Sequence, residues 1–152
     1  MRVKQFLGWL SVALLLGGCA SQGEYFGEYD DRHDGKATTM KSYYQIDEAG
    51  ESIHSFWRTD VCEEPWCQSM TYDAYEKDGK TLKKVRTLYT VDCERVEYQE
   101  NRKEWYNGSG KMMFWKESSG EAAWQDFARE DNPSLNYRDL GELLFTVCEA
   151  YE

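Results

Sequence analysis

The chain has 152 residues, and its 28 acidic side chains outnumber its 18 lysines and arginines, which gives a formal net charge of −10. The roughly 115 residues from 38 to 152 suffice for one domain with a hydrophobic core but not for two. Because nucleic-acid binding depends on lysine and arginine neutralising phosphates, the charge balance argues against a nucleic-acid partner.

The first residues have the pattern of a secretory signal. Arg2 and Lys4 precede an apolar run from Phe6 to Leu16, and two glycines then lead to Cys19. A basic start, a short apolar run and small residues before a cleavage site define such signals. The run is much shorter than the roughly 20 residues that span a bilayer. We predict a signal peptide over residues 1–18.

The end of this segment, Leu16-Gly17-Gly18-Cys19, resembles the bacterial lipobox. The resemblance implies that Cys19 is the first mature residue and carries fatty acyl chains, palmitate among them, which hold a protein firmly on a membrane. No other cofactor is expected. The alternative is a plain signal peptide whose cysteine falls at the cleavage site by chance. Residue 20 is alanine, whereas lipoproteins kept at the inner membrane have aspartate at this position. In this respect the chain resembles lipoproteins that are sorted to the outer membrane. The domain could lie on either the periplasmic or the surface face of that membrane.

Residues 20–38 are short of aliphatic side chains and rich in glycine, aspartate, glutamate and serine. A segment of this composition cannot bury enough apolar surface to fold by itself. We therefore expect a lipidated cysteine and flexible tether over residues 19–38 and one folded domain over residues 39–152. Removal of residues 1–18 leaves 16 basic against 28 acidic side chains, a net charge of −12 that favours basic partners.

Besides Cys19, the chain contains four cysteines: Cys62, Cys67, Cys93 and Cys148. An even number in an exported domain predicts a disulfide framework, for which three pairings exist. Pro65 lies between Cys62 and Cys67, so a short turn can join these two. That pairing leaves Cys93 for Cys148, and this longer loop would stabilise the fold by about 4 kcal/mol. A redox-active pair at 62 and 67, or a zinc site of four thiolates, is the alternative.

Six segments have the composition and alternation of β-strands: 39–46, 53–59, 69–76, 82–91, 94–106 and 112–116. Asp47-Glu48-Ala49-Gly50 separates the first two, and a turn with Asp78-Gly79 separates the next two, so each pair predicts a hairpin. A turn over residues 107–110 precedes the last strand. The many aromatic residues are expected to fill the core of this sheet rather than to form a sugar-binding surface.

The C-terminus changes to a helical spacing of apolar residues: Leu140, Leu143, Leu144, Val147, Cys148 and Tyr151. Cys148 lies on the apolar face of this predicted helix, so a bridge to Cys93 would hold the helix on the sheet. We predict an α+β fold: an antiparallel sheet of about six strands, packed by one C-terminal helix and stapled by disulfides.

Several landmarks now resemble a known family. Val91-Asp92-Cys93 ends a predicted strand, a turn runs from Tyr106 to Gly110-Lys111, Trp124 precedes Phe127, and the last helix carries Leu143-Leu144 and Val147-Cys148. Over roughly residues 40–150 this pattern resembles the surface-adhesin E-like family of bacterial outer-membrane lipoproteins. The resemblance implies a curved antiparallel sheet closed by the helix and the Cys93–Cys148 bridge, and binding to host matrix and serum proteins. The extra Cys62/Cys67 loop and the acidic charge depart from that family.

The sequence shows no signature of catalysis. A nucleophile elbow, a phosphate-binding loop and a His-Glu-x-x-His helix are all missing from it. His33 lies among acidic residues and is interpreted as part of a solvated charged run, and His54 is expected at the surface of a strand. We expect neither enzymatic activity nor a metal site.

The loop closed by Cys62 and Cys67 is the candidate binding loop, with Glu63, Glu64 and Trp66 as its contact residues. A tryptophan on a stapled loop is a rigid anchor of the kind that dominates protein interfaces, although Trp66 folded back over the sheet edge is an equal alternative. The expected function is an outer-membrane-anchored protein-binding module, with adhesion to host matrix or serum proteins as its biological form. The alternatives are a periplasmic inhibitor of a basic enzyme such as lysozyme, steered by charge, or a structural component of the envelope.

Overall fold

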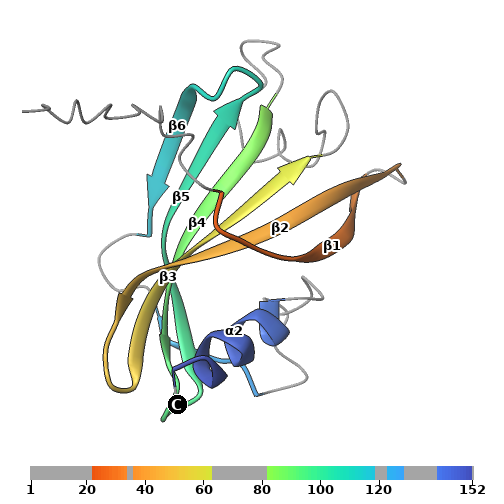
Figure 1. Ribbon diagram of the computed structural model, residues 1–152. Coiled ribbons are helices and arrows are strands. Elements are labelled where there is room, and N and C mark those ends of the chain that lie inside the picture. Colours follow the sequence, from red (N-terminus) through yellow and green to blue (C-terminus); the bar gives the residue numbers. More distant parts are fainter. Residues whose placement is uncertain (1–21, 34–35, 63–81, 119–122, 129–139, 152) are drawn as a thin grey trace, which may run out of the picture.

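The computed structural model describes residues 22–33, 36–62, 82–118, 123–128 and 140–151. Strands that follow one another along the chain are neighbours in one antiparallel sheet (Figure 1). They are β1 (Glu24–His33), β2 (Lys36–Ala49), β3 (Ile53–Cys62), β4 (Leu82–Asp92), β5 (Glu97–Asn107) and β6 (Met112–Glu117). The two-residue strand β7 (Gln125–Asp126) also pairs with β5. The helix α2 (Leu140–Glu149) lies across one face of the sheet, which confirms an antiparallel sheet packed by a C-terminal helix.

The first predicted hairpin is confirmed, and its strands are longer than the sequence pattern. β2 and β3 pair from Met40 opposite Cys62 to Ala49 opposite His54. At the turn, the Gly50 N–H donates to the carbonyl oxygen of Ile53 at 3.0 Å. A Cβ atom on residue 50 would lie 2.6 Å from that oxygen, so the turn requires glycine.

The later strands differ from the prediction in their bounds. β5 begins at Glu97 rather than at residue 94, because residues 93–96 form the turn after β4. The turn is held by the Arg95 N–H, which donates to Asp92 Oδ1 at 3.0 Å. The predicted turn at 107–110 is confirmed by a hydrogen bond from the Gly110 N–H to the Asn107 carbonyl at 3.0 Å. The predicted strand 69–76 and the turn at Asp78-Gly79 lie outside the described residues.

The prediction of a flexible tether was wrong for residues 24–33 and 36–38, which belong to β1 and β2. β1 pairs with β2 along its length, from Glu24 opposite Tyr44 to His33 opposite Lys36. Phe26 packs against the core, with its ring 6.3 Å from that of Tyr44. The averaged composition of this segment is polar, but its few aromatic residues are enough to attach it to a neighbouring strand.

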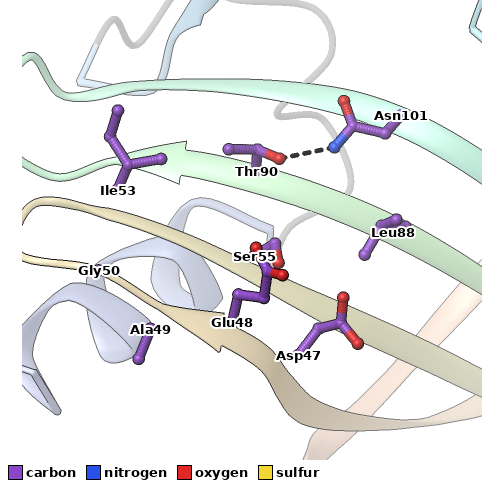
Figure 2. Close-up of a pocket in the computed structure, with 9 residues that line it drawn as sticks. All are labelled: Asp47, Glu48, Ala49, Gly50, Ile53, Ser55, Leu88, Thr90 and Asn101. Atoms are coloured by element: carbon purple, nitrogen blue, oxygen red, sulfur yellow. Dashed lines mark hydrogen bonds between the residues drawn. The ribbon is translucent and has the colours of Figure 1, made fainter.

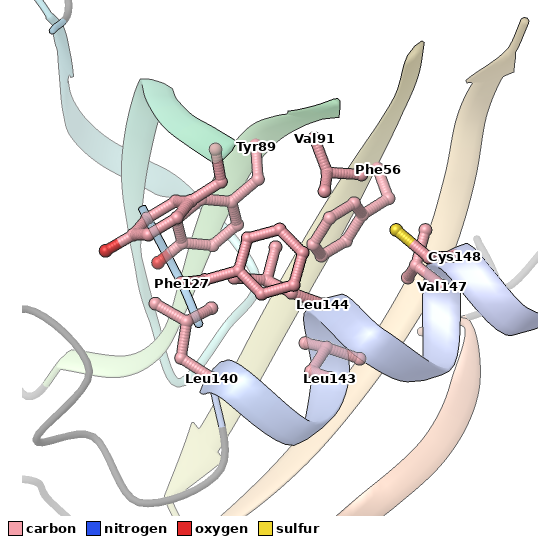
Figure 3. Packing of buried hydrophobic residues seen from close by; sticks show 10 residues of the cluster. Phe56, Tyr89, Val91, Phe127, Leu140, Leu143, Leu144, Val147 and Cys148 are labelled. Atoms are coloured by element: carbon pink, nitrogen blue, oxygen red, sulfur yellow. The ribbon is translucent and has the colours of Figure 1, made fainter. Parts of the chain in front are cut away.

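The main hydrophobic core lies between α2 and one end of the sheet (Figure 3). The helix contributes the apolar positions predicted from its spacing, and the sheet side contributes mainly aromatic rings: Phe56, Tyr89, Tyr98 and Phe127. The predicted disulfide joins Cys93 to Cys148, with the two Cα atoms 5.5 Å apart. In the described part of the chain, no helix has the length and apolarity needed to cross a bilayer.

A smaller cluster of buried residues lies at the other end of the same sheet face: Met40, Cys62, Leu82 and Trp105. Trp105 is buried and stacks on Phe114, with ring centroids 4.4 Å apart. The expectation that aromatic residues fill the core therefore holds for Trp105. It fails for Trp115 and Trp124, which are 50% and 39% exposed.

Polar residues of β3 are buried between and beside these two clusters. The Arg58 Nε atom lies 2.9 Å from both carboxylate oxygens of Asp60, which also accepts a hydrogen bond from Ser42. His54 is only 2% exposed, so its expected surface position was wrong. The alternation of β3 explains this, because His54 shares the helix-covered face with Phe56. The His54 ring lies 5.0 Å from that of Tyr151.

Candidate binding face

The sheet has a second face that points away from α2, which we call the outer face. Phe56 and Tyr89 point into the core beneath the helix, so their neighbours Trp57 and Leu88 point to the opposite side. Trp57 and Leu88 are partners in the register of β3 with β4. Alternation thus places a continuous set of side chains from β2 to β6 on this face.

Two aromatic side chains with three charged side chains between them cross the outer face from β3 to β6. We call them the cation–aromatic row: Trp57, Arg86, Glu104, Arg102 and Trp115. The Arg86 guanidinium carbon lies 4.3 Å from the Trp57 ring centroid, and that of Arg102 lies 4.5 Å from the Trp115 centroid. Such contacts contribute about 0.5–1 kcal/mol each at exposed sites.

Glu104 joins the two halves of this row. It accepts a hydrogen bond from Arg102 Nε at 2.8 Å, and its other carboxylate oxygen lies 3.9 Å from Arg86 Nη1. Glu104 is only 7% exposed, which is rare for a glutamate that is not paired. A single carboxylate thus lies between two guanidinium groups, each of which also contacts an indole ring.

Tyr106 and Lys84 extend the row on the side of β4 and β5. The Tyr106 hydroxyl donates to Glu104, and the Lys84 ammonium lies 4.4 Å from the Tyr106 ring centroid. Burial, and then the hydrogen bond to Glu104, raise the pKa of Tyr106 above its usual value. Burial, and then the nearby Arg86, lower the pKa of Lys84. Charged and aromatic groups are therefore packed closely enough to perturb one another.

An open hollow of about 610 Å³ lies on the outer face beside the row. Figure 2 shows Asp47 and Glu48 on the β2 side and Asn101 on the β5 side, with Ser55, Thr90 and Leu88 between them. The remaining lining residues are Ala49, Gly50 and Ile53. The hollow thus combines an apolar floor with oxygen-bearing side chains.

Two β-bulges explain why polar side chains gather at this place. Ile46 pairs with Phe56 and Glu48 with Ser55, which leaves Asp47 as an extra residue in β2. On the other side, Leu88 pairs with Arg102 and Tyr89 with Glu100, which leaves Asn101 as an extra residue in β5. Bulges redirect side chains and are enriched beside functional sites. Here both extra residues line the same hollow.

The hollow presents mostly hydrogen-bond acceptors. The Asn101 Nδ2 atom donates to the Thr90 hydroxyl at 2.6 Å, which leaves the amide oxygen as an acceptor. Asp47 and Glu48 are exposed and make no ion pair within the described part of the chain. Among the described residues that line the hollow, none is a lysine, an arginine or a histidine. The electrostatic character of the hollow is therefore negative.

The residues predicted for function fall into two groups. Cys19, Cys67, Glu63, Glu64 and Trp66 lie outside the described residues. Cys93 and Cys148 form the predicted bridge, and Cys62 is buried at the end of β3 and is itself disulfide-bonded. Sequence reasoning missed the outer face, although the alternation of Lys84 and Arg86 with apolar residues in β4 was its visible signal.

Within residues 22–33, 36–62, 82–118, 123–128 and 140–151, no three His, Cys, Asp or Glu side chains are placed to hold a metal ion. No family model matches the chain, and neither a curated protein nor a solved structure is significantly similar to it.

Proposed function

We propose that the chain is an outer-membrane-anchored lipoprotein that binds a protein partner through the outer face of its sheet. The supporting observation is the cation–aromatic row, in which Trp115 is half exposed beside the fixed guanidinium of Arg102. Tryptophan and arginine are the residues most enriched at the energetic centres of protein interfaces. Ordering such side chains before binding lowers the entropic cost of association.

The packing of the row favours a protein over a sugar as its ligand. A guanidinium covers one face of each indole, at 4.3 Å for Trp57 and 4.5 Å for Trp115. This contact occupies one of the two ring faces that a sugar could stack on, whereas protein contacts use ring edges and the N–H groups of the guanidinium as well. The resemblance to surface-adhesin E-like proteins supports adhesion to host matrix or serum proteins as the biological form.

A pull-down with the full chain, purified from bacterial membranes in detergent, tests this function. The prey are host matrix and serum proteins, lysozymes and an envelope extract. We expect one partner to be retained at physiological salt and lost with Trp115→Ala. Trp124→Ala is the matched control, because Trp124 is also a partly exposed indole and does not belong to the row. Retention that is insensitive to Trp115→Ala but lost with Trp66→Ala would move the site to the predicted binding loop.

A second candidate function is inhibition of a basic enzyme such as a lysozyme. The observation that favours it is the hollow, whose carboxylates at Asp47 and Glu48 form no ion pair with any of the residues that the structure describes. Inhibition that weakens steeply with added salt would support this candidate, since charge steering is screened over about 10 Å at 0.1 M salt. Binding of envelope proteins alone would instead support a structural role.

The anchoring part of the proposal has its own test. Cys19 in the wild-type chain should incorporate a labelled palmitate in growing bacteria, and Cys19→Ser should abolish both the label and outer-membrane fractionation. Label that persists in Cys19→Ser would contradict the proposed attachment site.

A further inference from the structure

The charges of the outer face are separated into two regions. Arg102 follows Asn101 directly in the chain, yet its guanidinium turns away from the hollow toward Glu104 at 2.8 Å and Glu117 at 3.3 Å. Arg86 is likewise held beside Glu104. The cations of the row are therefore neutralised by their own carboxylates, and the hollow next to them keeps its negative charge.

From this separation we infer that the hollow receives a lysine or arginine side chain of the protein partner, as the specificity pocket of the outer face. This inference rests on the proposed function and adds the chemistry of the partner to it. The aliphatic stem of such a side chain would lie against Leu88 and Ile53, while its charged end meets Asp47 and Glu48.

The polar groups of the hollow suit a ligand that donates hydrogen bonds. Carboxylates only accept, and the Asn101 amide oxygen is a further acceptor, while one of the two N–H groups of this amide donates to Thr90. An ammonium has three donors and a guanidinium has five, and neither accepts. An acidic side chain would be repelled by these oxygens, and an apolar side chain would leave them without hydrogen-bond donors. Charge and hydrogen bonding therefore both favour a lysine or arginine side chain.

The hollow is not an isolated pair of exposed carboxylates, because the cation–aromatic row lies next to it. Trp57 pairs with Leu88 in the register, so the floor of the hollow continues directly into the row. When a side chain of the partner protein lies in the hollow, neighbouring residues of the same partner would thus contact the indoles of the row. The acceptor-rich hollow and the aromatic row together define a contact for a basic, exposed segment of a protein.

Two capped peptides serve as probes: acetyl-Ala-Lys-Ala-amide and its norleucine analogue, which has the same stem without the charge. Each is titrated into the full, isotope-labelled chain in detergent and followed by amide chemical shifts. We expect the lysine peptide to shift Ser55, Thr90 and Asn101, and the norleucine peptide to shift them weakly or not at all. Asp47→Asn/Glu48→Gln should weaken the lysine peptide about tenfold. Glu51→Gln, an exposed acidic residue of the same hairpin outside the hollow, should change nothing.

The outcomes distinguish this inference from the proposed function. Equal binding of the two peptides, or shifts spread over other acidic surfaces and unchanged in the double variant, would overturn the pocket. A protein partner captured through Trp115 but indifferent to Asp47→Asn/Glu48→Gln would leave the proposed function standing and remove the pocket. A lysine peptide bound at the hollow, with no protein captured through Trp115, would uphold the pocket and contradict the row.

Discussion

Asp47 and Asn101 lie on different strands, far apart in the sequence, and each is the extra residue of a β-bulge that lines the same hollow. A regular β2 would have directed consecutive side chains to opposite faces. The bulge instead lets both Asp47 and Glu48 line the outer hollow. The negative charge of this site therefore depends on a backbone irregularity and not only on residue identity.

The first prediction concerns the bridge between Cys93 and Cys148. These residues are 55 positions apart, and on the chain-entropy view a loop of that size contributes about 4 kcal/mol to the free energy of unfolding. Cys93→Ala/Cys148→Ala should lower the unfolding free energy by about 2–5 kcal/mol in urea denaturation. A loss below about 1 kcal/mol would mean that apolar packing alone holds α2 on the sheet.

The second prediction tests whether β1 belongs to the folded domain rather than to a flexible tether. A chain that starts at residue 39 lacks β1 and the Phe26 side chain, which packs against the core. Loss of one buried aromatic side chain and a row of strand pairing should lower the unfolding free energy by about 2 kcal/mol or more. The control is a chain that starts at residue 22, and the readout is again urea denaturation. Equal stability of the two chains would restore the tether interpretation.

The third prediction compares Glu104, the buried carboxylate of the row, with Glu117, an exposed carboxylate that also contacts Arg102. Glu104→Gln removes the negative charge between Arg86 and Arg102, and we expect a loss of about 1.5–3 kcal/mol in unfolding free energy. Glu117→Gln is the control, because the Glu117 side chain is 61% exposed and surface pairs contribute at most about 1 kcal/mol. If the two variants lose the same amount, Glu104 does not organise the row.

The fourth prediction concerns alkaline pH. Burial raises the pKa of Tyr89, Tyr44 and Tyr106 above the ordinary value of 10.0. In the unfolded chain these groups lose their protons first, so the stability they contribute is complete below pH 10 and is lost as the pH rises through their folded pKa values. Thermal unfolding should therefore shift to lower temperature above about pH 10. Tyr106→Phe should reduce this shift, and an unchanged pH profile would contradict the burial-induced rise.

Patterns along the chain were sufficient wherever one local rule dominates. The spacing of Leu140, Leu143 and Leu144 predicted α2, because a helix must bury one stripe of side chains. Glycine at position 50 predicted the first hairpin, since the turn allows no Cβ there. The Cys93–Cys148 bridge followed from an even cysteine count and from the short loop between Cys62 and Cys67, whose pairing leaves Cys93 for Cys148. These features depend on periodicity and covalent chemistry, which are visible in a single sequence.

Tertiary structure decided the rest. β1 is a strand because Phe26 packs against Tyr44 and the core. The average composition of the segment does not reveal this contact. His54 is buried because side chains alternate along β3, which places His54 on the same face of the sheet as Phe56. The outer face needs two bulges and a carboxylate shared between arginines of two neighbouring strands, and neither feature has a local signal. Residues remote in sequence create such sites only after the register of every strand is set, because a shift of one position exchanges the two faces of a strand.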